Sequence, residues 1–465
     1  MDPNTLFTEL RRHLSPDEIL HGEGRGGDLS CDSPPPDFII RPTCTAKVGP
    51  VLATLTQCGT AFAPWGGRTS YSEATFVADR PWVALDTSRL DAIMAIEPTD
   101  MFVTVEAGCT WAKLKSALGP LGLKTGFWGP ASGRHSTVGG ALSQHAVFFG
   151  STRYGTSANG VLGLSVALPD GRIVETGSSG FDGSSPFFRH AGPDLTGPFL
   201  GDCGALGVKL RATLQLQPLP AATSYQGWRF ASRALFCDAF RQIAAQGLAS
   251  DVVGAHGAHF ELHLAFEGAS EAINTEMATM AEHICRAAGG APAPALLGHM
   301  HADPFPALGM LGTGNRRWIP IHAIVPHSRH ARAIDTIEAI TGEYRDVMQQ
   351  HRIECASVSL AVGPTGVLIE ANLTWGGLPN ALADKFLMEA GESQPSGGTP
   401  ADHAVLTDLR GAIAQRLQLL GAVNLQIGRY YSYRSRLTPG TRDLFDTLRS
   451  AGDPAHINNP GILDL

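Results

Sequence analysis

The chain has 465 residues, of which 43% are hydrophobic and 17% are charged, and its formal net charge is −8. This length is too great for one hydrophobic core, so we expect at least two domains. The negative charge argues against a nucleic-acid partner, and the absence of a bilayer-length apolar run argues against a transmembrane segment.

The eight cysteines lie singly, without a Cys-x-x-Cys pair or a metal-finger spacing. The charged N-terminal stretch also lacks the apolar core of a signal peptide. We therefore expect a cytoplasmic protein whose thiols are reduced.

In chain order, the first notable stretch is residues 61–71, an apolar lead followed by Pro-Trp-Gly-Gly-Arg-Thr-Ser-Tyr. Gly66 and Gly67 allow positive φ and close approach of the backbone to a ligand. Arg68 supplies a fixed positive charge, and the next three residues supply hydroxyl groups. Successive amide groups in such a turn bind anions, so the stretch predicts a diphosphate-binding loop; a plain surface turn is the alternative reading.

Residues up to 220 predict short strands and helices around two further glycine-rich stretches, 130–140 and 194–208. Strands are expected at Trp82–Asp86, Ile93–Ile96, Phe102–Glu106, Leu162–Leu168, Ile173–Thr176 and Leu210–Leu216. Three loops rich in glycine and hydroxyl residues suit a ligand with many phosphate and ribose oxygens. Pro218 and Pro220 are typical of a domain boundary.

Beyond this boundary the elements become longer. Strands are expected at Phe260–Phe266, Trp318–Val325, Ala356–Val362 and Val367–Leu373, and helices at 270–288, 329–350 and 402–420. The alternation predicts an antiparallel sheet with helices on one face, an α+β cap.

The order of motifs in residues 40–217 resembles the FAD-binding domain of the vanillyl-alcohol oxidase/p-cresol methylhydroxylase (PCMH-type) superfamily. The matching motifs are Pro64–Ser70, Asp86–Leu90, Val103–Gly108, Ser136–Gly140, Arg153–Thr156, Leu168–Gly171 and Gly201–Gly207. The resemblance implies an α+β fold with a two-part FAD-binding domain at 1–218, a cap domain at 219–420, and a segment at 421–465 that returns to the FAD domain.

The resemblance also implies one FAD per chain and a set of cofactor-binding residues. These are Pro64, Trp65, Gly66, Gly67, Arg68, Thr69, Ser70, Tyr71, Ser136, Thr137, Gly139, Gly140, Tyr154, Gly204, Gly207, Val208 and Asn459. Members with covalent flavin use a histidine just after the two glycines, where this chain has Arg68 and Thr69. We therefore expect the FAD to be bound non-covalently.

Three functions remain open from the sequence. The first, and favoured, is oxidation of a small phenolic or benzylic alcohol, because Trp375, Tyr430, Tyr431 and Tyr433 offer aromatic rings and Arg429 and Arg434 offer charge. The second is a 2-hydroxy-acid dehydrogenase, with Arg316 or Arg317 holding the carboxylate. The histidines that D-lactate dehydrogenase and glycolate oxidase relatives carry are missing from Leu360–Gly366 and Val423–Gly428.

The third function is a flavin-binding electron-transfer subunit without substrate chemistry of its own. The electron acceptor (oxygen, a quinone or a cytochrome) stays open, and a homo-oligomer is possible. No metal is expected: His299 and His301 lack a third ligand, and Cys203 is interpreted as a buried thiol without a redox role.

Candidate catalytic groups lie at and just before the expected strand Phe260–Phe266. The period of two places His259, Glu261 and His263 on one face of this strand. A solvated face is the ordinary reading of such a pattern. The functional hypothesis is that His259 or His263 lies over the flavin and acts with Arg429 or Tyr431 on the substrate.

Overall fold

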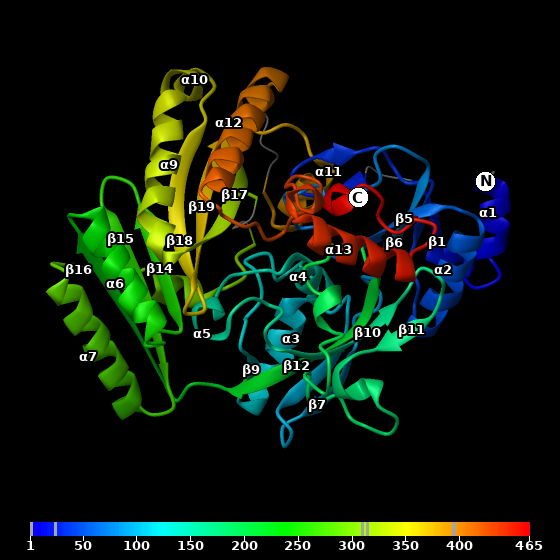
Figure 1. The fold of residues 1–465 in the computed structure, drawn as a ribbon, viewed down its shortest axis with the longest axis horizontal. Coiled ribbons are helices and arrows are strands. Elements are labelled where there is room, and N and C mark those ends of the chain that lie inside the picture. The colour runs from blue at the N-terminus through cyan, green and yellow to red at the C-terminus, as the bar shows by residue number, and fades with distance from the viewer. Residues whose placement is uncertain (1–2, 23–25, 308–310, 313–315, 393–396) are drawn as a thin grey trace.

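The computed structural model of this protein describes residues 3–22, 26–307, 311–312, 316–392 and 397–465. Figure 1 shows two bodies side by side. In the first, the cap, long helices cover one large sheet. The second carries both the N- and C-terminal labels, and we call it the cofactor domain because the stretches predicted to bind FAD lie in it. Strands and helices occupy separate layers of the cap, which confirms the predicted α+β class.

The first sheet of the cofactor-domain body has the strand order β1-β4-β6-β5. Its strands are β1 (Ile19–His21), β4 (Phe38–Ile40), β6 (Trp82–Asp86) and β5 (Ala61–Trp65), and β6 runs parallel to both β4 and β5. The helices α1 (Pro3–Leu10) and α2 (Val48–Gln57) belong to the same core as this sheet. The parallel strands β5 and β6 are almost wholly buried, as expected of strands covered on both faces.

The second sheet of this body has the order β11-β10-β12-β8-β7, and β9 pairs with the far end of β12. The strands are β7 (Ile93–Glu97), β8 (Phe102–Glu106), β9 (Leu123–Thr125), β10 (Val161–Ala167), β11 (Ile173–Glu175) and β12 (Val208–Pro218). The helices α3 (Trp111–Leu118) and α4 (Val138–Gln144) contribute to its core, and α5 (Ser151–Tyr154) contacts the cap. A two-stranded ribbon, β2 (Gly26–Gly27) with β3 (Asp32–Ser33), lies in the N-terminal part.

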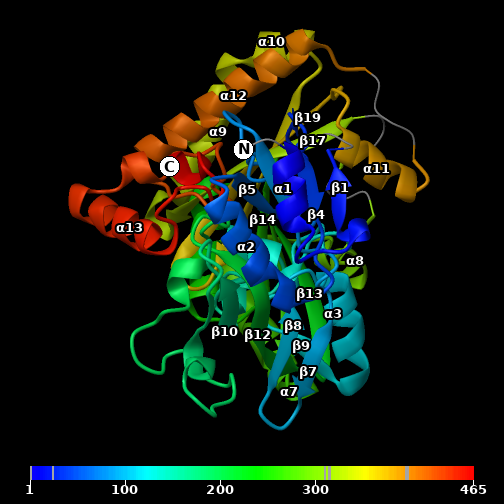
Figure 2. The same ribbon diagram turned by 90° about the vertical axis from the view of Figure 1, so that its right-hand side faces the viewer.

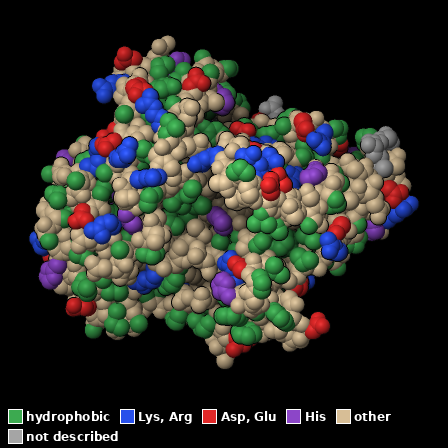
Figure 3. Space-filling model, viewed as in Figure 1, with side chains coloured by type: hydrophobic (Ala, Val, Ile, Leu, Met, Phe, Trp, Pro, Cys, Tyr) green, Lys and Arg blue, Asp and Glu red, His purple; other side chains and the backbone are tan. Residues whose placement is uncertain are grey.

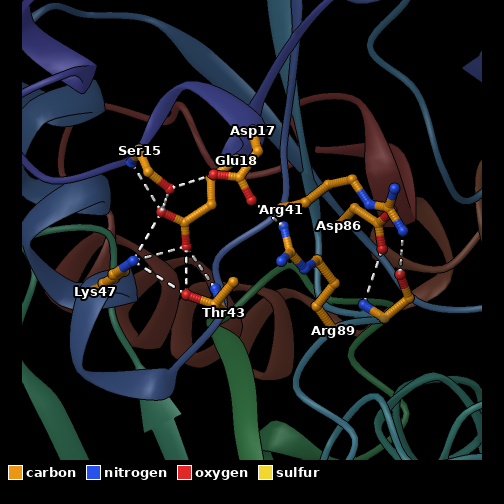
Figure 4. A network of polar contacts seen from close by, with 9 residues as sticks. Ser15, Asp17, Glu18, Arg41, Thr43, Lys47, Asp86 and Arg89 are labelled. Atoms are coloured by element: carbon orange, nitrogen blue, oxygen red, sulfur yellow. Dashed lines mark hydrogen bonds and ion pairs between the residues drawn. The ribbon is translucent and has the colours of Figure 1, made fainter.

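A buried carboxylate fixes the N-terminal segment to the first sheet (Figure 4). The fully buried Glu18 accepts hydrogen bonds from Ser15, from both the backbone and the hydroxyl of Thr43, and from Lys47, whose Nζ lies 2.7 Å from Oε2. Burial alone would raise the Glu18 pKa, but these hydrogen bonds outweigh it and hold the pKa well below its usual range.

The cap contains a seven-stranded antiparallel sheet with the order β16-β13-β15-β14-β18-β19-β17. Its strands are β13 (Ala222–Phe230), β14 (Asp251–His256), β15 (Phe260–Gly268), β16 (Ala291–Ala293), β17 (Arg317–Pro326), β18 (Glu354–Val362) and β19 (Gly366–Trp375). One face packs on α6 (Arg233–Ala245), α7 (Glu271–Ala287), α9 (His330–Glu343) and α12 (Pro400–Leu419) (Figure 1). This arrangement confirms the predicted antiparallel cap.

Two details of the cap differ from the sequence predictions. The helix expected over 329–350 ends at Glu343, and α10 (Arg345–Gln350) begins after a break at Tyr344. His259 lies in the tight turn between β14 and β15, where the Gly257 N–H donates to the His259 carbonyl, and not on the strand. The short helices α8 (Leu297–Ala302) and α11 (Ala381–Glu389), and α13 (Pro439–Gly452), complete the structure.

The segment after α12 connects the two bodies. Val423 and Ile324 exchange backbone hydrogen bonds, so this segment pairs with the outer edge of β17. Further along, Asn458 pairs with Phe62 of β5. Figure 2 shows α13 and the C-terminus lying close to β5 and α2. Within the described ranges, no helix is both long enough and apolar enough to cross a bilayer.

Candidate functional site

The three glycine-rich stretches form the walls of a cleft in the described chain. Its empty volume of about 920 Å³, part of it open to solvent, lies near the upper end of the roughly 300–1,000 Å³ that ligand and cofactor sites occupy. Eight hydroxyl side chains and six glycines line the cleft, and its charged lining residues, Arg68 and Lys209, are both basic. This lining suits a large anionic ligand.

The loop after β5 forms one wall because its glycines pack directly against the opposite wall. A Cβ at Gly67 would lie 1.9 Å from the carbonyl oxygen of His135, and a Cβ at Gly66 would lie 2.3 Å from the Thr137 hydroxyl oxygen. The Arg68 guanidinium stacks 4.2 Å over the Trp65 ring, and burial lowers the pKa of Arg68. The loop therefore presents backbone and a cation to the cleft.

The wall at residues 202–209 contains a buried ion pair. Lys209 Nζ lies 2.7 Å from Asp202 Oδ1, and both side chains are at most 3% exposed. Asp202 also accepts the N–H groups of Gly204 and Leu206, which fixes the turn. Cys203 lines the cleft, and burial raises its thiol pKa to about 12, so the sulfur stays protonated.

Most of the residues predicted to bind the cofactor line this cleft, and three do not. The lining residues are Pro64, Trp65, Gly66, Gly67, Arg68, Thr69, Ser70, Ser136, Thr137, Gly139, Gly140, Gly204, Gly207 and Val208. The ring of Tyr71 lies instead against Trp318 of the cap, with centroids 5.1 Å apart. Tyr154 packs against Gly126 near the domain interface, and Asn459 lies behind the wall, donating to the carbonyls of Ala74 and Cys203.

The two histidines predicted to be catalytic lie outside the cleft lining. His259 is exposed in the turn between β14 and β15, so it does not share a strand face with Glu261. His263 is 3% exposed and its Nε2 lies 3.7 Å from Glu261 Oε2; burial lowers its pKa. On the same face of β15, Ala265 packs on Phe149.

Arg429 and Tyr431, the other two predicted catalytic residues, both bind backbone. Arg429 donates to the carbonyls of Glu73 and Pro460 and to the Asn459 side chain, so it ties the C-terminal segment to the cleft wall. The Tyr431 hydroxyl accepts the backbone N–H of His322 at the outer edge of β17. Neither side chain lines the cleft.

A polar group that the sequence analysis missed lies on the cap sheet face turned toward the cofactor domain. We call Trp318, His322, Glu370 and Asn372 the cap-face cluster. His322 and Glu370 are directly opposite in the register of β17 and β19, and Trp318 Nε1 donates to Asn372 Oδ1 at 2.8 Å. Their odd-numbered neighbours, such as Ile321 and Ile369, belong to the core shared with the helices.

The cap-face cluster is connected to the cleft through two segments. His322 Nε2 lies 3.0 Å from the Leu425 carbonyl oxygen, and the next residue, Gln426, lines the cleft. Tyr71, which contacts Trp318, directly follows the lining residue Ser70. Polar residues at every second position in otherwise apolar strands were the available sequence signal for this cluster.

The other arginines and histidines that the sequence analysis considered lie outside the cleft lining. Arg316 pairs with Glu354, and Arg317 pairs with Asp384 of α11. His301 Nε2 lies 3.3 Å from Asp251 Oδ2, and the His301 ring packs against Trp128. Among the described residues, no three His, Cys, Asp or Glu side chains come together in an arrangement that would hold a metal ion.

The comparisons with known proteins agree with this geometry. A family model described as an FAD binding domain matches residues 36–177. Mitochondrial D-lactate dehydrogenase [cytochrome] of Arabidopsis thaliana is 32% identical over 185 residues, which are 40% of this chain and 31% of that enzyme. Glycolate oxidase subunit GlcD of Bacillus subtilis is 28% identical over 187 residues, 40% of this chain and 38% of that protein. The matched stretch thus spans about a third of these curated relatives.

The fold matches over nearly the whole chain. The crystal structure of p-cresol methylhydroxylase with substrate bound superposes with a TM-score of 0.78 at 16% identity, covering 99% of this chain and 96% of that one. The glycine loops, the basic lining and the space of the cleft all fit FAD. The matched family model identifies residues 36–177 as an FAD binding domain, so FAD is the cofactor of this site, and the fold over nearly the whole chain is that of p-cresol methylhydroxylase.

Proposed function

We propose that this protein is an FAD-dependent oxidoreductase that oxidises a small 2-hydroxy acid. The observation that carries the proposal is the cleft itself, which the segments of Tyr71 and Leu425 connect to a cap face with hydrogen-bonding side chains. The bound flavin would supply an acceptor for a hydride from the substrate carbon. The chain would supply binding, orientation and a water-poor chamber between cleft and cap.

Within the cleft, each wall has a distinct role in this proposal. The loop from Gly66 to Ser70 would hold the diphosphate with backbone amides and the Arg68 charge, and the Ser70 hydroxyl is fixed by Asp28 at 2.6 Å. The residues around Thr137 and Gly207 would line the rest of the cofactor. Binding without a covalent bond remains our prediction, because Arg68 and Thr69 are poor nucleophiles.

The substrate class follows from the sequence relatives. D-lactate dehydrogenases and a glycolate oxidase subunit are among the curated proteins that align with this chain, and these relatives support placing the 2-hydroxy acid before the phenolic substrate that the sequence analysis favoured. A phenolic or benzylic alcohol is the second candidate. It is favoured by the aromatic ring of Tyr71, which lies against Trp318 of the cap-face cluster.

An anaerobic reduction experiment tests both candidates together. Purified protein with its flavin is mixed with glycolate, D-lactate and L-lactate, and in parallel with 4-hydroxybenzyl alcohol and p-cresol, while the flavin absorbance is followed. We expect a hydroxy acid to bleach the flavin. Bleaching by the phenols alone would favour the second candidate, and bleaching by neither would favour a flavin-binding subunit without substrate chemistry.

A further inference from the structure

One member of the cap-face cluster has an environment that packing does not explain. Glu370 lies in the middle of β19, opposite His322 on one side and Val358 on the other. By its register it points away from the helical layer and toward the cofactor domain, since Ile369 and Ala371 pack in the helix-covered core. Its side chain is only partly exposed.

The groups around Glu370 are polar but uncharged. His322 is held neutral because burial lowers its pKa to about 4, and the Tyr71 and Tyr431 phenols stay protonated because burial raises their pKa values. Asn372, itself fixed by Trp318, hydrogen-bonds the Glu370 carboxylate. Burial nevertheless raises the pKa of Glu370 to about 7.

The nearby cations are already engaged. Arg410 donates to the carbonyls of Tyr71 and Pro320, and Arg317 pairs with Asp384. Among the described residues, no ion pair includes Glu370. A carboxyl group in a sheet interior without a cation is unfavourable for folding. Such groups gather at functional sites, where a proton must be taken up and released.

We propose that Glu370 is the catalytic base that removes the hydroxyl proton of the substrate at the cap side of the cleft. This inference rests on the proposed function and adds the identity of the proton acceptor. Glu370 takes the place that the sequence analysis gave to His259 or His263, which lie in a turn and at another part of the sheet.

The reaction balances with this assignment. Oxidation of the alcohol breaks the C–H and O–H bonds of the substrate and forms its C=O bond. The bound flavin would supply the acceptor for the hydrogen and its electron pair from carbon, and the ionised Glu370 carboxylate would accept the hydroxyl proton. Asn372, which Trp318 fixes by a hydrogen bond, would hold the Glu370 carboxylate in place during this transfer.

The test compares Glu370→Gln with Glu354→Gln, a glutamate on the same sheet whose side chain is 71% exposed beside Arg316. With saturating hydroxy acid, we expect Glu370→Gln to lower the flavin reduction rate by about 100-fold or more, while the substrate dissociation constant changes little. The wild-type rate should rise with pH through the Glu370 pKa, and this rise should vanish in Glu370→Gln. Glu354→Gln should behave like the wild type.

A second readout needs no substrate. A carboxyl whose pKa is raised by folding stabilises the protein below its unfolded pKa, and this stabilisation is lost as the pH rises through the folded pKa. Wild-type melting temperature should therefore fall from pH 5 to pH 8 more steeply than that of Glu370→Gln, which should be the more stable protein at pH 8. Equal slopes would overturn the assignment.

The outcomes also separate this inference from the proposed function. If hydroxy acids or phenols reduce the wild-type flavin and Glu370→Gln reduces at the same rate, the role of Glu370 is wrong and the proposed function stands. If neither class reduces the wild-type flavin, the proposed function fails and the catalytic role fails with it, while the melting curves still report whether Glu370 titrates near neutral pH.

Discussion

The cofactor cleft and the cap-face cluster adjoin each other but are built from opposite materials. The cleft is shaped by backbone: at Gly67 and Gly66, the space that a Cβ would fill is already taken by the facing wall. The cap-face cluster is built from side chains of two strands, brought together by the pairing of His322 with Glu370. From this difference we expect that a side chain added at the cleft glycines disrupts the cleft. In the cap-face cluster, a substitution of the same size should keep the structure and change only the chemistry.

The largest effect should come from adding one methyl group to the cleft. In Gly67→Ala, the Cβ would collide with a backbone carbonyl 1.9 Å away, so the two walls must separate. We expect a loss of at least about 4 kcal/mol in FAD binding, roughly 1,000-fold in affinity. Gly160→Ala, where the Cβ would meet nothing within 4 Å, is the control. Flavin retained on purification is the measurement, and normal retention by Gly67→Ala would contradict the rigid-wall description.

The next effect concerns the ion pair in the cleft wall. Lys209→Met leaves the Asp202 carboxylate buried with only the N–H groups of Gly204 and Leu206 as partners. We expect the free energy of unfolding to fall by about 3 kcal/mol, the lower end for broken buried pairs. Urea denaturation measures it, with Lys113→Met, which removes an exposed pair with Asp91, as the control. A loss as small as the control's would show that solvent reaches Asp202.

A smaller effect should appear in the cap in acid. The His322 pKa lies at about 4 in the folded protein and near 6.5 unfolded, so its stabilising contribution is complete above pH 6.5 and is lost as the pH falls toward 4. Linkage gives a loss of about 2 kcal/mol by pH 5. Denaturant midpoints at pH 7 and pH 5 test this. His322→Gln should flatten the pH dependence, and the exposed His13→Gln should leave it unchanged.

The smallest effect separates structure from catalysis at Tyr431. Tyr431→Phe removes the acceptor of the His322 backbone N–H, so we expect a loss of about 1 kcal/mol in stability. The rate of flavin reduction by substrate should stay within a few-fold of wild type. Tyr433→Phe removes a phenol hydroxyl from the same segment and serves as the control. A large fall in rate in Tyr431→Phe alone would restore the sequence-based catalytic hypothesis.

The sequence predicted the cleft better than the cap because of how each is encoded. The glycine loops are contiguous stretches, so their composition already specifies where backbone approaches a ligand. Tyr71, which was predicted to bind the cofactor, lies outside the cleft lining because its ring points toward Trp318. Composition does not record the direction in which each side chain of a loop points.

For the cap, the period of two identified a polar strand face but not which strands of the sheet lie beside it. His263 and Glu370 both lie on that face, yet only the strand order places Glu370, rather than His263, beside the edge strand β17. Pairing between β17 and β19 is a long-range feature that a local pattern does not specify. The breaks at His259 and Tyr344 likewise depend on turn geometry.

The segment after α12 determines the order in which the parts of the protein can assemble during synthesis. It seals the β17 edge through Val423, contributes Gln426 to the cleft wall, and through Asn459 holds the loops of Ala74 and Cys203. During synthesis the three glycine loops leave the ribosome long before this segment does. Until it docks, the cleft is missing a wall and β17 has an open edge prone to aggregation. FAD can therefore be enclosed only at a late step of synthesis. A chain that stalls near residue 420 would neither keep its flavin nor stay in solution.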